Sequence, residues 1–128
     1  MSFVAETGSG HAFVMDGAPE GGGRNLGPRP METVLAGTGG CTAYDVVVIL
    51  RKSRQQVSAC EVQLQAERAE TDPKVFTKIH MHFVVRGREL KASVVESAIK
   101  LSHSKYCSAS AMLAKTAAMT WDYEILAD

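Results

Sequence analysis

The sequence predicts an α+β domain in which helices cover one side of an antiparallel sheet. Helical spacing of apolar residues and strand-like alternation occur in separate segments, and together they carry this prediction. The chain has 128 residues, enough to bury a sizeable core, and we expect one domain over residues 1–128.

The N-terminal part predicts a hairpin followed by a loop. Segments 2–7 and 11–16 have the composition of two short strands, joined by a turn at residues 8–10. The following segment, 17–30, contains five glycines and three prolines, which suit neither a helix nor a central strand.

A long helix is predicted next, over residues 31–52. Pro30 suits a first helical turn, the apolar residues recur at helical spacing, and Arg51 and Lys52 suit the last turn. Few charges lie along it, which favours burial on several sides. The chain has no run of about 18 apolar residues, so we expect no segment that spans a membrane.

This helix carries an unusual run, GTGGC at residues 37–41. Each glycine inside a helix costs roughly 0.5–1 kcal/mol relative to alanine. Either another backbone packs very close to this face, or space is left around Cys41 for a small reactant.

The remaining elements complete the sheet and its cover. Segments 57–67 and 75–86 alternate apolar and polar residues and form a long hairpin, since a Thr-Asp-Pro turn lies between them. An amphipathic helix is expected at 89–102, and the break HSKYCS precedes a short helical piece at 109–117. Segment 119–126 alternates again and predicts the last strand.

Composition excludes several function classes. Fourteen basic side chains balance fourteen acidic ones, so nothing favours binding to nucleic acid or to an anionic membrane. The N-terminus lacks the basic and apolar regions of a signal peptide, and we expect a cytoplasmic protein. There, three cysteines indicate free thiols, catalytic dithiols or metal ligands. Zinc is disfavoured because no CxxC pair is present.

The three cysteines lie in different settings. Cys60 is among the inward residues of a strand, where a thiol behaves as a small hydrophobic group. Cys41 has Asp45 one helical turn beyond it, and a carboxylate disfavours a neighbouring thiolate unless a cation intervenes. Arg24 and Arg29 are the candidate cations for this role.

Cys107 lies at the break before a short helix, where the helix dipole favours a thiolate. It is 66 positions from Cys41 in the sequence. The two could meet as an attacking and a resolving thiol, or both could be buried structural residues.

Histidines offer two further candidates. His80 and His82 form an HxH pair on the outward face of a strand, but two ligands are too few for a metal, so solvated surface is the favoured interpretation. His103 lies four residues before Cys107, as a candidate base or a helix C-terminal cap.

Two motifs together resemble the OsmC/organic hydroperoxide resistance family, and its YhfA-like branch most closely. They are RPMETVLAGTGGCTAYDVVVIL around Cys41 and LSHSKYCSASAML around Cys107. The resemblance covers almost the whole chain, because the order of elements also fits.

The resemblance implies an intertwined homodimer with the cysteine helices at its centre and two active sites at the interface. It implies thiol-dependent reduction of small hydrophobic organic hydroperoxides, with Cys41 as the peroxidatic and Cys107 as the resolving cysteine. An external dithiol would serve as reductant, and no metal, flavin or haem cofactor is implied.

The chain departs from the family's peroxidases at the residues that activate the thiol. Those proteins use an arginine from the hairpin, in a pattern like TGGR, whereas this chain has TGSGH with His11 as the nearest cationic candidate. They also use a glutamate in an NPE motif. Here Pro30 matches the proline, Met31 takes the glutamate position, and Glu32 follows one residue later. Arg24 or Arg29 with Glu32 could rebuild an ion pair.

The sequence therefore predicts a peroxidase that acts in oxidative-stress defence. The alternative is an OsmC-like protein that binds a small apolar ligand or senses redox state without peroxidase turnover. Thiol chemistry on another electrophile is a third interpretation.

Overall fold

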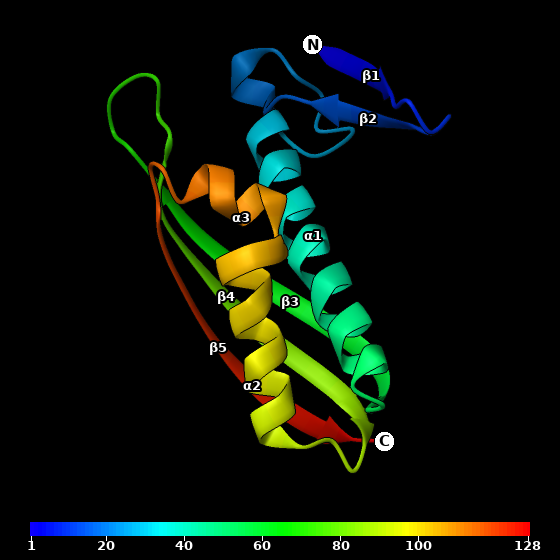
Figure 1. The fold of residues 1–128 in the computed structure, drawn as a ribbon. Coiled ribbons are helices and arrows are strands. Elements are labelled where there is room, and N and C mark those ends of the chain that lie inside the picture. Colours follow the sequence, from blue (N-terminus) through cyan, green and yellow to red (C-terminus); the bar gives the residue numbers. More distant parts are fainter. The chain divides into compact units, whose positions relative to one another are not determined.

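The computed structural model describes all residues from 1 to 128. The chain forms two compact units, Met1–Ala36 and Gly37–Asp128, and helix α1 (Pro30–Lys52) runs from the first into the second (Figure 1).

The N-terminal unit contains the predicted hairpin. Strands β1 (Ser2–Glu6) and β2 (Ala12–Asp16) pair antiparallel, in a register that places Ser2 opposite Asp16. A 3₁₀ turn at Pro19–Gly21 interrupts the loop that leads to α1. Large apolar side chains are exposed on both strands of this hairpin, namely Phe3, Val4, Phe13 and Val14.

Asp16 fastens the loop to the hairpin. Its carboxylate accepts hydrogen bonds from the Ser2 hydroxyl at 2.9 Å and from the backbone N–H groups of Gly17 at 2.7 Å, Arg24 at 3.2 Å and Leu26 at 3.2 Å. Desolvation acts to raise the pKa of Asp16, but these hydrogen bonds outweigh it and lower the pKa to about 2.

The C-terminal unit is built on a three-stranded sheet of order β3-β4-β5. Strands β3 (Gln56–Arg68) and β4 (Phe76–Arg88) form the predicted antiparallel hairpin. Strand β5 (Ala118–Ala127), however, runs parallel to β4, which corrects the expectation of a fully antiparallel sheet. The helical crossover between β4 and β5 returns the chain to the end of the sheet where β4 began, so β5 must run in the same direction.

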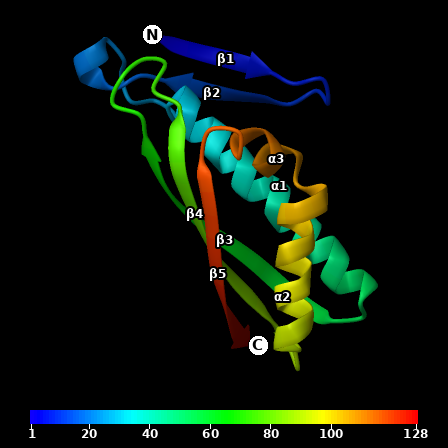
Figure 2. The same cartoon turned by 60° about the vertical axis from the view of Figure 1, so that its left-hand side comes forward.

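Helices cover one face of this sheet, as the two views in Figures 1 and 2 show. They are the Gly37–Lys52 part of α1, α2 (Ala92–Leu101) and α3 (Ser108–Leu113). The α+β class is therefore confirmed, with helices on a single side.

The core forms where the alternating strand residues meet the helices. From Ile79 to Gly87 every second residue of β4 is buried, as its period predicts, while the outward Lys78 is exposed and the outward His80 and His82 are partly exposed. The buried apolar residues of β4, α1 and α2 include Ile79, Met81, Phe83, Val85, Val46, Leu50, Val95, Ala98 and Ile99.

Helix α1 forms where the sequence predicts it. Pro30 is its first residue, the Glu32 carboxylate accepts a 2.8 Å hydrogen bond from the backbone N–H of Arg29, and Arg51 and Lys52 occupy its last turn. Its 23 residues have a mean hydropathy of 1.5 over the most apolar window, so by length and composition alone it could cross a membrane. From the sequence we expected no segment that could span a membrane. The core helix of a soluble protein meets the same criterion, and 28% of that window is buried within the fold.

The glycines of α1 have different surroundings. A Cβ built at Gly39 would lie 2.6 Å from Cδ1 of Leu64, so this glycine permits close packing of β3 on the helix. A Cβ at Gly37 or Gly40 would meet nothing within 4 Å. These two glycines therefore lie on a face that the chain itself leaves open.

The crossover contains an irregular turn. Helix α2 ends at Leu101, and a π-helical turn, Ser102–Tyr106, connects it to Cys107 and α3. Such π turns occur frequently at functional sites. The predicted break therefore exists, and it places Ser102 in the interior of the fold with 0% exposure.

Candidate functional site

Cys41 and Cys107, far apart in the sequence, meet in the C-terminal unit. Their sulfur atoms and one carboxylate oxygen of Asp45 all lie within 4.8 Å of one another. Both cysteines are free thiols; Cys41 is partly exposed and Cys107 is buried. The two thiols are thus close enough for a small movement to join them in a disulfide, whose S–S bond is about 2.05 Å long.

Helix α3 begins at Cys107. The Cys107 sulfur accepts a 3.3 Å hydrogen bond from the backbone N–H of Ser110, as an N-cap residue does. Burial raises the pKa of the Cys107 thiol, the hydrogen bonding of Ser110 partly offsets this, and the neighbouring Cys41 raises it further. Cys107 is therefore a thiol that stays protonated at neutral pH, which suits a resolving role better than an attacking one.

Asp45 is the end of a buried hydrogen-bond chain. The Ser102 hydroxyl donates to Oδ2 of Asp45 at 3.0 Å, and the hydroxyls of Thr42 and Ser102 are 2.8 Å apart. Because Ser102 has a single hydroxyl proton, Thr42 must be the donor in the second bond. This chain fixes the carboxylate beside the two sulfurs.

An open groove of about 350 Å³ adjoins Asp45. It lies between α1 and the end of α2, and its lining is Tyr44, Asp45, Val48, Ile49, Lys52, Ser53, Leu101 and Tyr106. Most of these side chains are apolar, so the groove suits an apolar group.

The candidate activating residues belong to the N-terminal unit. The Arg29 guanidinium donates to the side-chain oxygen of Asn25, while Glu32 accepts from the backbone N–H of Arg29. Arg24 is exposed, and His11 hydrogen-bonds to Ser9 in the hairpin turn at 3.0 Å. No ion pair joins Glu32 to either arginine, so the ion pair inferred from the sequence is not formed here.

Cys60 and His103 are both partly buried, in surroundings that differ from those of the two paired thiols. Burial raises the pKa of the Cys60 thiol to about 11, in agreement with its interpretation as a small hydrophobic residue. The His103 ring stacks on Trp121 with centroids 6.2 Å apart and meets Phe83 edge-on, and burial lowers its pKa. The His103 ring therefore packs among aromatic side chains in its neutral form.

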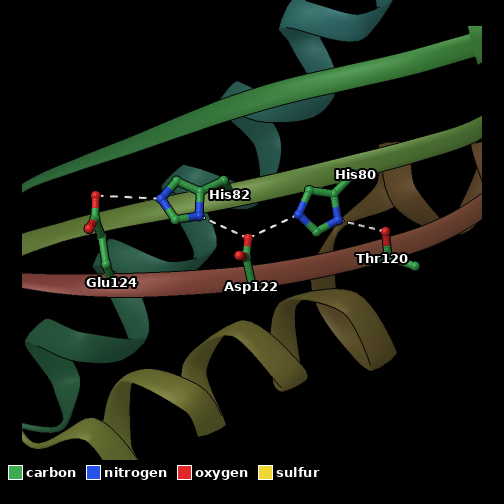
Figure 3. Close-up of polar contacts among 5 residues, drawn as sticks. All are labelled: His80, His82, Thr120, Asp122 and Glu124. Atoms are coloured by element: carbon green, nitrogen blue, oxygen red, sulfur yellow. Dashed lines mark hydrogen bonds and ion pairs between the residues drawn. The ribbon is translucent and has the colours of Figure 1, made fainter.

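The HxH pair has acidic partners on the neighbouring strand (Figure 3). Oδ1 of Asp122 lies 2.9 Å from Nε2 of His80 and 2.8 Å from Nδ1 of His82, and Glu124 lies 3.5 Å from His82. Hydrogen bonds with Asp122 and Glu124 raise the pKa of His82, against desolvation, which acts to lower it. The pair forms a hydrogen-bonded surface network with these carboxylates.

Sequence reasoning missed the roles of Ser102, Thr42 and Ser110. Ser102 lies 57 residues from its acceptor Asp45, and no local pattern marks either hydroxyl as a partner. The only available signal was the run of serines around Cys107, SHSKYCSAS, in a chain segment with broken helical periodicity.

Comparisons with known proteins identify a family, curated relatives and solved structures with the same fold. The family model described as "OsmC-like protein" matches residues 21–122. Protein YhfA of Escherichia coli strain K12 is 47% identical over 127 residues, which cover 99% of this chain and 92% of that protein. A solved structure of a protein from Aquifex aeolicus VF5 is 30% identical, with a TM-score of 0.79 over 97% of this chain and 88% of that one. The organic hydroperoxide resistance protein OhrB of Bacillus subtilis is 16% identical and shares the fold, with a TM-score of 0.60 over 97% of this chain and 96% of that one.

Proposed function

The chain belongs to the OsmC-like protein family, and from that premise we propose that it is a thiol-dependent peroxidase that reduces organic hydroperoxides. The observation that carries the proposal is the approach of two free thiols, Cys41 and Cys107, within 4.8 Å in a site next to an apolar groove. The solved fold relatives include a protein named for organic hydroperoxide resistance.

The reaction proceeds in three balanced steps. The Cys41 thiolate attacks the outer oxygen of ROOH, the O–O bond breaks, and the leaving alkoxide takes a proton to give ROH, while Cys41 becomes a sulfenic acid. The Cys107 thiol then attacks the sulfenic acid sulfur of Cys41, and the Cys41–Cys107 disulfide forms. The displaced hydroxide takes up the thiol proton and leaves as water. An external dithiol reduces the disulfide and becomes oxidised itself.

The roles of the two thiols follow from their settings. Cys41 is the more exposed of the two and is accessible to a substrate, whereas Cys107 is buried with a raised pKa. The lining of the groove beside Asp45 favours a small hydroperoxide with an apolar tail. The steps need no metal, flavin or haem.

Substitution of each candidate residue can identify the group that activates Cys41. Arg24, Arg29 and His11, with Glu32, are the candidates from the family resemblance. We expect one of the three cations to be needed, because a peroxidatic cysteine reacts as its thiolate and a nearby cation stabilises that form. A variant whose pH profile of Cys41 alkylation matches the wild type excludes that residue.

A homodimer with active sites at its interface belongs to the same proposal. Two separate surfaces support it: the exposed apolar side chains of the β1–β2 hairpin, and the open face of α1 at Gly40, where Tyr44 is 73% exposed. A two-stranded hairpin is marginally stable in water without a further partner. A cytoplasmic location also belongs to the proposal, and the three free cysteines suit a reducing compartment.

The decisive experiment exposes the reduced protein to one equivalent of cumene hydroperoxide and reads intact and peptide masses. We expect the loss of two hydrogens, a linked Cys41–Cys107 peptide and an unmodified Cys60. Cys41→Ser abolishes the reaction, and Cys107→Ser stops it at the sulfenic acid. Thiols that remain inert in the folded wild type would contradict the proposal.

A second function is favoured by one observation, the mostly apolar groove that adjoins Asp45 beside the two thiols. In that case the protein binds a small apolar ligand or senses redox state without turnover. Saturable ligand binding by the fully reduced protein, with no dithiol-dependent consumption of hydroperoxide, distinguishes this function from the first.

A further inference from the structure

The reduced site brings together three metal-binding groups from two distant parts of the chain. The sulfurs of Cys41 and Cys107 and one carboxylate oxygen of Asp45 lie within 4.8 Å of one another. In a tetrahedral zinc site, with bonds of about 2.0–2.3 Å, the ligand atoms are roughly 3.3–3.8 Å apart. A contraction of about 1 Å would therefore give three of the four corners of such a site.

Hydrogen bonds already orient two of these groups. Ser102 donates to Oδ2 of Asp45 at 3.0 Å, and the backbone N–H of Ser110 donates to the Cys107 sulfur at 3.3 Å. A carboxylate has lone pairs to spare, so Asp45 can accept from Ser102 and still bind a cation. Outer hydrogen bonds of this kind fix the ligands in protein metal sites.

A further observation comes from the Ser110 side chain. Ser110 is 2% exposed, so its side-chain hydroxyl is buried. Since the backbone N–H of the same residue binds the Cys107 sulfur, this hydroxyl lies beside the cluster. Ser110 therefore contributes a buried polar group to the immediate surroundings of the Cys107 sulfur, where such groups orient the ligands of protein metal sites.

We propose that Cys41, Cys107 and Asp45 of the reduced protein bind one Zn²⁺ ion, with the fourth coordination position open to water or a small ligand. Two thiolates and a carboxylate form a soft, triply negative ligand set that suits a thiophilic divalent cation. Binding displaces the two thiol protons to solvent, and no electron is transferred. Both sulfurs are then occupied, so zinc slows the reaction of the dithiol with any electrophile.

The proposal goes beyond the peroxidase function and does not depend on it. Metal binding is measured on reduced protein without hydroperoxide, and turnover is measured in the presence of a chelator. Failure of either proposal is therefore seen separately.

The test titrates reduced, metal-free protein with Zn²⁺ against a chromophoric chelator, and with Co²⁺ followed by its thiolate charge-transfer absorption. We expect one ion per chain. Cys41→Ser and Cys107→Ser weaken zinc binding more than 100-fold, and Asp45→Asn weakens it by about tenfold or more, in line with the 10–100-fold cost of even outer-shell changes. Cys60→Ser is the matched control and leaves the affinity unchanged.

Three results would overturn the proposal: no stoichiometric binding, binding that survives loss of Cys41 or Cys107, or an Asp45→Asn variant with wild-type affinity. If a variant fails to fold, a measurement on the wild type alone still tests the proposal. Zinc should protect Cys41 and Cys107 from alkylation, read by peptide mass, while the alkylation of Cys60 stays the same. Equal alkylation of Cys41 and Cys107 with and without zinc would also contradict the site.

Discussion

At the scale of single residues, Ser102 links two polar side chains of α1 near the two thiols. It has 0% exposure and holds both Asp45 and Thr42 through one hydroxyl. It is the first residue of the π-helical turn, and its hydroxyl reaches two side chains of α1.

We predict that Ser102→Ala destabilises the protein by about 1–3 kcal/mol, because Thr42 and Asp45 lose their partner in the interior. Chemical denaturation of the reduced protein measures this change. Ser104→Ala, at an exposed position of the same turn, is the matched control and should change stability by less than about 0.5 kcal/mol. Equal stability of Ser102→Ala and wild type would show that the hydrogen-bond chain contributes nothing.

Residue identities and pairing could be predicted from the sequence only in part. The two cysteine motifs allowed Cys41 and Cys107 to be matched by resemblance, and their separation of less than 4.8 Å agrees with that match. The residues alone left open whether the thiols meet, because a separation of 66 positions carries no geometric information. The Asp45–Ser102 bond was not predictable for the same reason.

At the scale of elements, α1 has glycines on two faces, and these faces have different surroundings. Gly39 meets Leu64 of β3, whereas Gly40 faces open space. The question posed by the sequence, whether the glycines serve close packing or a reactant, therefore has an answer within the chain only for Gly39.

We predict opposite effects for alanine at these two positions. Gly39→Ala costs about 1–3 kcal/mol of folding stability, since its Cβ would overlap Leu64, whose side-chain end can move only partly away. Gly40→Ala gains about 0.5–1 kcal/mol of helix propensity within the protomer but weakens the proposed dimer, because a Cβ then separates the packed helices. Sedimentation velocity and denaturation measure both. An unchanged self-association of Gly40→Ala would contradict a helix contact at this position.

The outer face of the sheet makes a prediction about pH. Hydrogen bonds with His82 and His80 lower the pKa of Asp122, and Asp122 in turn raises that of His82. His82 contributes fully to the free energy of unfolding below its unfolded pKa of 6.5. This contribution is lost as the pH rises through the higher pKa of the folded state. The contribution of Asp122 is present above its unfolded pKa of 3.8 and is lost on acidification.

Wild type should therefore exceed Asp122→Asn in stability most between pH values of about 4 and 6.5, and the difference should narrow on either side. Denaturation midpoints across pH 3 to 9 (roughly the range spanned by the two groups) measure this dependence. Glu61→Gln, on β3 of the same sheet, is the control and should show no such window. A pH-independent difference would exclude the ion pair as its cause.

Strand positions were predictable from period-2 alternation, and the direction of β5 was not. Alternation places Trp121 and Tyr123 on one face of β5, which their ring contact at 6.4 Å confirms. Period-2 alternation is the same in parallel and antiparallel pairing. The direction of β5 therefore depends on the crossover and not on the strand's own residues.

At the scale of the whole molecule, different interactions stabilise each of the two compact units. The C-terminal unit has a continuous apolar core, whereas the N-terminal unit exposes its large apolar side chains and relies on Asp16 to fix its loop. The two units should therefore respond differently to acid.

We predict that acidification loosens the N-terminal unit selectively. The Asp16 pKa is about 2 in the fold against 3.8 unfolded, so its contribution is complete above a pH of about 4 and is lost as pH falls towards 2. Hydrogen exchange of the Leu26 and Arg24 amides should accelerate across this range before that of β4. Asp16→Asn should remove this early step at acid pH and show the fast exchange already at neutral pH. Uniform exchange across the chain would contradict the prediction.

The closeness of the two thiols also decides how the chain responds to mechanical force. A Cys41–Cys107 bond would close a loop of 66 residues that contains β3, β4 and α2. Pulled from its two ends, the oxidised chain would extend only its terminal portions, and its full length would be shorter than that of the reduced chain by roughly 220 Å. The redox state of these two sulfurs would thus decide whether the segment between them carries the load or is bypassed.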